Sequence, residues 1–144
     1  MRKLALLLLV TACAKPQPPA PDVTLGGTPR ARVVVMTQAL VTKESGPKES
    51  LAAFGESYAF VPSTFSVRQD EPTEVVFWNL QGDDEHDVML LDSRRKVVLQ
   101  AKLPPLKKTP FVMTFHRAGL FDFYCTVHQP EMSGQVVVIK RAAP

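Results

Sequence analysis

Three side chains able to bind a soft metal ion lie close together near the C-terminus. Cys125, His128 and Met132 follow the spacing Cys-x2-His-x3-Met between two apolar stretches. A thiolate, an imidazole and a thioether together suit copper, whereas zinc takes cysteine and histidine but has little use for methionine. Cys125 or Met132 alone would be read as an inert buried side chain, but three ligand types in one short loop predict a copper site.

A trigonal set of two histidines and one cysteine, with a weak axial methionine, is the arrangement of blue-copper electron-transfer sites. The second histidine must come from elsewhere in the chain, where His86 and His116 are available. His86 opens an apolar stretch after an acidic loop, whereas His116 lies in a turn and is expected to be exposed. We therefore predict the ligands to be His86, Cys125, His128 and Met132. The other methionines of the mature chain are interpreted as core residues: Met36, Met89 and Met113.

The N-terminus has the features of an export signal. Met1-Arg2-Lys3 precedes the apolar run Leu4–Val10, which is too short to span a bilayer, and small residues lead to Cys13. The stretch 9–13 resembles a bacterial lipobox, so we predict a lipoprotein signal peptide at 1–12 and lipidation of Cys13; an ordinary signal peptide is the alternative. Prolines are frequent in 13–30, which predicts an extended tether, with the folded domain at 31–142. Cys125 would then be a lone thiol in an oxidising compartment, where an unpaired cysteine usually has a function.

The rest of the chain has the pattern of an all-β protein. Short β-branched or alternating apolar stretches are separated by turn signals, for example at 64–68, 86–91 and 134–140. A short helix is expected at 48–54, where Gly55 would end it. About seven to eight strands in roughly 110 residues predict a single β-sandwich domain.

The stretch from Tyr58 to Lys140 resembles the cupredoxins of the plastocyanin and azurin type. The matching features are Phe60-Val61-Pro62, Phe77-Trp78-Asn79, His86 opening a strand, the run from Gly119 to Cys125, and Met132-Ser133-Gly134 before the last strand. The resemblance implies a Greek-key β-sandwich holding one type 1 copper ion, with Met132 as the long axial ligand. Asp87 stands where the family often has Asn. Its carboxylate is expected to accept a backbone N–H from the Cys125 loop or to lie near Thr126, and the alternative is a simple surface charge.

These features predict a membrane-anchored carrier of single electrons on the extracytoplasmic side of a bacterial membrane. Its partners would be redox proteins such as a cytochrome or a membrane respiratory complex. The alternative is a copper trafficking or storage protein, but such a protein would favour exposed Met-rich or His-rich tracts. A copper enzyme would need a second centre, and only His116 is spare, so no enzymatic activity is expected.

The charge of the mature chain is close to neutral. Without Arg2 and Lys3, the number of Lys and Arg residues falls from 17 to 15, against 14 Asp and Glu. This balance makes nucleic acid an improbable partner.

Overall fold

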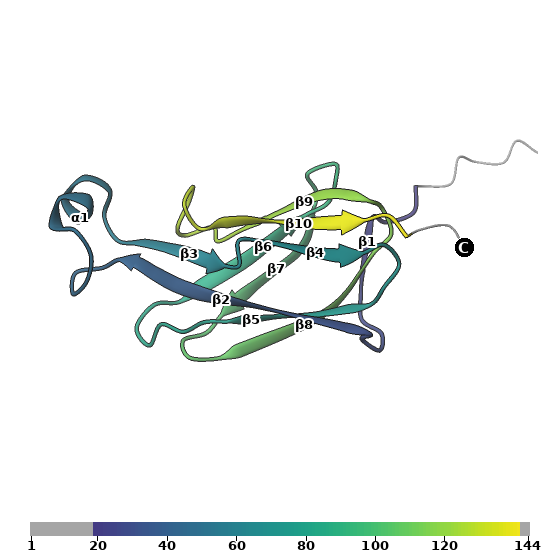
Figure 1. The fold of residues 1–144 in the computed structure, drawn as a ribbon, viewed down its shortest axis with the longest axis horizontal. Helices are drawn as coiled ribbons and strands as arrows, with labels where there is room; N and C mark the ends of the chain where they lie inside the picture. Colours follow the sequence, from purple (N-terminus) through teal and green to yellow (C-terminus); the bar gives the residue numbers. More distant parts are fainter. Residues whose placement is uncertain (1–18, 142–144) are drawn as a thin grey trace, which may run out of the picture.

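The fold is a sandwich of two five-stranded sheets (Figure 1). A computed structural model describes residues 19–141. The first sheet has the order β1-β8-β5-β2-β3 and the second the order β4-β10-β9-β6-β7. The strands are β1 (Val23–Leu25), β2 (Ala31–Val41), β3 (Ser57–Val61), β4 (Thr64–Arg68), β5 (Thr73–Trp78), β6 (His86–Leu91), β7 (Val97–Leu103), β8 (Lys108–Phe115), β9 (Gly119–Tyr124) and β10 (Ser133–Ile139). The predicted β-sandwich is confirmed, with ten strands in the described residues rather than seven to eight.

The two sheets enclose one apolar core. Alternate residues of the strands point inward, as in β4, where Phe65 and Val67 are buried between exposed neighbours. Aromatic rings meet at its centre, where Phe123 lies 5.3 Å from Phe60 and 5.8 Å from Phe77, measured between ring centroids. This core fixes the strands whose ends carry the candidate ligands.

Two pairs of neighbouring strands are parallel, β2 with β5 and β4 with β10, while the other pairs are antiparallel. A parallel pair needs a crossover between the sheets, so the chain changes sheet repeatedly instead of running as a simple meander. This is the connectivity expected of a Greek-key sandwich.

The folded part of the chain begins before residue 31, so the predicted tether boundary was too late. Val23 is buried and pairs with Phe115, so that β1 adds a strand to the edge of the first sheet. The prolines around this segment concealed a strand of only three residues. The predicted signal peptide and Cys13 lie outside the described residues.

The predicted helix is α1 (Lys48–Phe54), and it is followed by Gly55 with φ of 77°. It lies between β2 and β3 and projects beyond one end of the sandwich (Figure 1). None of its residues is buried, and Phe54 is 77% exposed. Among the described residues, no helix is both long enough and apolar enough to cross a membrane.

Candidate metal centre

The predicted ligands meet at one end of the second sheet. His86 is the first residue of β6, while Cys125 directly follows β9 and Met132 directly precedes β10. Antiparallel pairing of Met89 with Tyr124 brings the start of β6 beside the end of β9. Strands far apart in the sequence therefore carry His86 and Cys125 to the same place.

His86, Cys125 and His128 form a compact group of donor atoms. Their ligand atoms all lie within 4.8 Å of one another. The two Nδ1 atoms of His86 and His128 are 3.1 Å apart, and Nδ1 of His128 lies 3.6 Å from Sγ of Cys125. Convergence of two imidazole nitrogens and one thiol sulfur matches the strong-donor set of a blue-copper site, so these residues fit a copper ion.

Burial separates the roles of the two histidines. His86 is 1% exposed and Cys125 fully buried, whereas His128 is half-buried. Burial, together with the nearby His128, lowers the pKa of His86 to about 4, so its ring is neutral and able to bind a metal at neutral pH. Burial also raises the pKa of the Cys125 thiol. Cys125 is not in a disulfide.

Met132 is fully buried in the same loop. Its backbone is fixed by two hydrogen bonds: its N–H donates to the His128 carbonyl at 2.9 Å, and its carbonyl accepts the Cys125 N–H, also at 2.9 Å. This loop keeps the Met132 side chain in the buried core, in the same segment as Cys125 and His128. The axial role that the resemblance implies for Met132 stays a prediction.

Gly134 follows this loop at a point where β10 approaches its neighbours closely. A Cβ atom at this position would lie 2.2 Å from the Ser63 carbonyl oxygen and 2.4 Å from the Phe123 ring. The adjacent Gln135 N–H donates to the same Ser63 carbonyl at 2.8 Å. Only glycine allows this approach, which explains the Met132-Ser133-Gly134 run in physical terms.

Asp87 joins the two ligand-bearing segments, as predicted. Its carboxylate accepts the backbone N–H of Thr126 at 2.6 Å and the hydroxyl of Thr126 at 2.5 Å. These short distances are typical of hydrogen bonds to a charged acceptor. Since Asp87 follows His86 and Thr126 follows Cys125, the pair fixes one ligand relative to the other.

Gln81 is a functional residue that the sequence did not reveal. Its side-chain oxygen lies 3.1 Å from Nε2 of His86, and because an amide oxygen can only accept, Nε2 must carry the proton. The opposite nitrogen, Nδ1, is then free to bind a metal. Metal-binding histidines commonly need such a partner on the second nitrogen.

A buried network of polar side chains holds Gln81 in turn. The Thr37 hydroxyl contacts the Gln81 oxygen and accepts the Leu80 N–H at 2.9 Å. Asn79 donates to the carbonyls of Asp84 and Leu103, each at 2.8 Å. The sequence signal for Asn79 was its place in Phe77-Trp78-Asn79, but nothing local marks Thr37, which lies 42 residues away.

Tyr58 is a further residue whose role sequence reasoning missed. Its ring centroid lies 4.9 Å from that of His86 and 4.6 Å from that of His128, so it covers both imidazoles. Its hydroxyl donates to the Asp84 carboxylate. Burial and this carboxylate raise the pKa of Tyr58, which therefore remains a neutral donor.

The other sulfur and imidazole side chains lie away from the donor group. His116 is exposed, as predicted, and its Nδ1 lies 2.8 Å from Asp70. Met113 is buried in the core as expected. Met36 and Met89 are only half-buried, and Met89 accepts a hydrogen bond from the Tyr124 hydroxyl at 3.1 Å.

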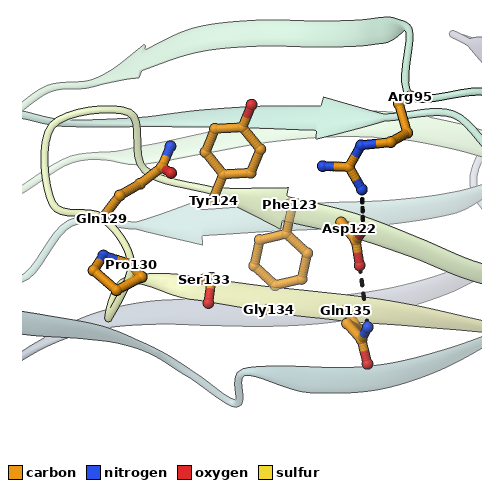
Figure 2. A pocket seen from close by; sticks show the side chains of 9 residues that line it. All are labelled: Arg95, Asp122, Phe123, Tyr124, Gln129, Pro130, Ser133, Gly134 and Gln135. Atoms are coloured by element: carbon orange, nitrogen blue, oxygen red, sulfur yellow. Dashed lines mark hydrogen bonds and ion pairs between the residues drawn. The ribbon is translucent and has the colours of Figure 1, made fainter.

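A surface groove of about 390 Å³ lies beside the ligand loop on the outer face of β9 and β10 (Figure 2). Gln129 and Pro130 of the loop line one part of it. At another part, Asp122 accepts hydrogen bonds from Arg95 at 3.2 Å and from Gln135 at 3.1 Å. Since Cys125 and His86 are buried and do not line this groove, it is distinct from the metal centre.

Comparison with known proteins identifies the fold. No family model matches the chain, and no curated protein sequence matches it. Among solved structures, amicyanin from Paracoccus versutus is similar with a TM-score of 0.51 and 19% identity over 82% of this chain and 98% of that one. Auracyanin B is similar with a TM-score of 0.59 and 14% identity over 82% and 94%. A multicopper oxidase from Campylobacter jejuni is similar with a TM-score of 0.61 and 11% identity, over 81% of this chain but 31% of that one. The chain therefore has a cupredoxin fold, as predicted.

Proposed function

We propose that this protein carries single electrons by means of one type 1 copper ion held by His86, Cys125, His128 and Met132. The observation that carries the proposal is the convergence of two imidazoles and a buried thiol within 4.8 Å, with a buried methionine in the same loop. Bound copper would supply a one-electron couple between its two oxidation states.

The protein side chains keep this site rigid and dry. Gln81 orients His86, and Asp87 ties the β6 end to the Cys125 loop. Burial of His86 and Cys125 excludes water from the donor group. A donor set fixed before the metal binds needs little rearrangement between oxidation states, and fast electron transfer depends on this.

His128 is the proposed point of electron entry and exit. It is half-buried, while its neighbour Val127 is 67% exposed. Among the acidic side chains at this end, Asp84 binds Tyr58 and Glu85 pairs with Lys102 at 2.6 Å, while Asp83 and Glu131 are exposed. A small apolar surface around His128 suits brief contacts with a redox partner, such as a cytochrome or a membrane respiratory complex.

Copper trafficking or storage is the alternative function. It would favour exposed donors that release metal readily, whereas here His86, Cys125 and Met132 are each at most 1% exposed. Within residues 19–141, the group around Cys125 is the single cluster of three or more His, Cys, Asp or Glu side chains placed to hold a metal. This favours one copper centre and electron transfer over an oxidase with several coppers.

We also propose that the protein is lipidated at Cys13 and held on the extracytoplasmic side of a bacterial membrane. The support is the sequence 9–13 and the proline-rich segment that follows it. Replacing Cys13 by Ala should release the protein from the membrane fraction while leaving its copper spectrum unchanged. A mature N-terminus without lipid and away from Cys13, found by mass spectrometry, would contradict this.

The test of electron transfer is a stopped-flow rate with a small cytochrome at several salt concentrations. Val127→Glu should slow the exchange without changing the optical spectrum, because it adds charge beside His128. His116→Ala, the control, should exchange at the wild-type rate, with a mild salt dependence in both cases. Equal rates for wild type and Val127→Glu would contradict entry at His128.

A further inference from the structure

The end of the sandwich opposite the metal centre is a basic pole. Strand ends and turns there carry seven exposed Lys or Arg side chains without an ion pair among the described residues, namely Arg30, Arg68, Arg94, Lys96, Arg117, Lys140 and Arg141. The location follows from the strand directions: β6 and β10 start at the metal centre and end at this pole, while β9 starts here and ends at Cys125.

The carboxylates at this pole are largely committed to other groups. Asp22 is buried and accepts a hydrogen bond from Ser93, and Asp70 pairs with His116. Asp92 accepts the backbone N–H groups of Arg94 and Lys96, each at 2.8 Å. Glu71 also lies at this pole, beside Arg68, Lys140 and Arg141, so seven exposed basic side chains face four carboxylates and the pole keeps a positive balance.

Two groups of basic residues can be recognised within the pole. Arg94 and Arg117 both lie close enough to Asp22 to lower the pKa of its carboxyl, after the larger effect of the Ser93 hydrogen bond. Arg68, Lys140 and Arg141 line one shallow hollow of about 480 Å³ together with Glu71 and Ile139. The basic side chains thus come from several strand ends and turns of the pole, and only some of them line the hollow.

Apolar side chains are exposed at the same pole. Val97 begins β7, Leu120 is the second residue of β9 and Ile139 ends β10; they are 54%, 57% and 52% exposed. Exposed apolar groups among basic ones are the combination that binds an anionic lipid surface, where cations meet headgroups and apolar groups reach the acyl boundary.

The chain enters the domain at this pole. The Asp22 carbonyl accepts the His116 N–H at 2.8 Å, and Val23 pairs with Phe115 at the end of β8. Strand β1 lies at the end of the sandwich away from α1 (Figure 1). A lipid anchor N-terminal to residue 19 would therefore hold this end, and not the metal centre, nearest the membrane.

We propose that the basic pole is a contact surface for anionic phospholipid headgroups, which orients the domain with its metal centre pointing away from the bilayer. The contact goes beyond the proposed anchor, because it requires binding without any lipid on Cys13. Each basic side chain near an anionic bilayer contributes about a fivefold factor in partitioning, so several together bind measurably.

The experiment is co-sedimentation of the chain from residue 14 onward, which keeps all described residues, with vesicles. Phosphatidylcholine mixed with phosphatidylglycerol should bind the protein at low salt, and phosphatidylcholine alone should not. The variant Arg94→Gln/Arg117→Gln/Lys140→Gln should bind the anionic vesicles at least tenfold more weakly. The matched control Lys43→Gln/Lys48→Gln/Lys107→Gln loses the same charge at the end of the sandwich that carries the metal centre. It should keep most of the binding to anionic vesicles.

Equal weakening in both triple variants would overturn the proposal, because net charge and not the pole would then govern binding. Absence of binding to anionic vesicles would also overturn it, leaving the pole as a surface for an acidic protein partner. Circular dichroism of each variant establishes that it is folded. The copper spectrum and the cytochrome assay report on the proposed function independently of either outcome.

Discussion

The bridge between Asp87 and Thr126 gives a quantitative prediction for the ligand loop. Asp87→Ala removes two hydrogen bonds to a carboxylate, one from the Thr126 N–H and one from its hydroxyl. Such bonds contribute about 1.5–3 kcal/mol each. Because the pair is partly exposed, we expect a total at or slightly below the sum of the two lower limits, about 2–3 kcal/mol. With a urea m-value of about 1.5 kcal/mol/M, the unfolding midpoint should fall by about 1.5 M.

Two further variants separate the contributions. Thr126→Val removes the hydroxyl but keeps the backbone N–H, so it should cost about half as much, roughly 1 kcal/mol. Asp87→Asn keeps an acceptor for the N–H and should cost less than about 1 kcal/mol, although it loses the charge. The double variant Asp87→Ala/Thr126→Val should cost less than the sum of the two single changes, because they share one interaction.

The assay is urea unfolding of the metal-free protein, followed by circular dichroism. The reasoning would be refuted if Asp87→Ala changed the free energy of unfolding by less than about 0.5 kcal/mol, the usual range for an exposed residue without a structural role. Equal destabilisation by Asp87→Asn and Asp87→Ala would show that charge matters and the hydrogen-bond geometry does not.

Three other predictions concern the donor group. Met132→Leu should retain copper and raise the reduction potential, measured by redox titration, because a donor that favours the oxidised ion is lost; loss of copper would contradict an axial role. Gln81→Leu should lower copper affinity by about 10–100-fold in a competition titration, since the Nε2–H of His86 loses its acceptor, while Gln81→Glu should retain most of it. In the metal-free protein, the folded-state pKa of His86 is about 4, below the ordinary value of 6.5. The stability that neutral, buried His86 contributes is therefore fully present above pH 6.5 and is lost as the pH falls from 6.5 through 4. This loss in the free energy of unfolding, up to about 3 kcal/mol, should be absent in His86→Gln. A free energy of unfolding that does not change with pH in the wild type would refute this prediction.

The sequence allowed the metal centre to be predicted because three of its ligands lie in eight consecutive residues, Cys125 to Met132. His86 followed from its position at the start of a strand. The supporting side chains could not be found in this way. Thr37 reaches Gln81 across 44 residues, and Tyr58 reaches His128 only after the two sheets have packed.

The fold was predictable for a related reason. Alternation in strands such as β4 is a local signal, and so is the Gly55 that follows α1. The early strand β1 has three residues in a proline-rich setting, and its partner Phe115 is far away in sequence, so no local pattern indicated it. Likewise, composition predicted α1 but not that it would bury none of its residues.

The most direct test of the proposed site is the visible absorption and copper content of the copper-loaded protein. One copper per chain with a strong thiolate-to-copper charge-transfer band is expected, because Cys125 lies within 3.6 Å of the His128 Nδ1 in a group of two imidazoles and one thiol. Cys125→Ser should abolish the band, since a hydroxyl cannot supply that transition, while His116→Ala should leave it intact. A colourless copper(II) protein, two coppers per chain, or an unchanged band in Cys125→Ser would contradict the assignment.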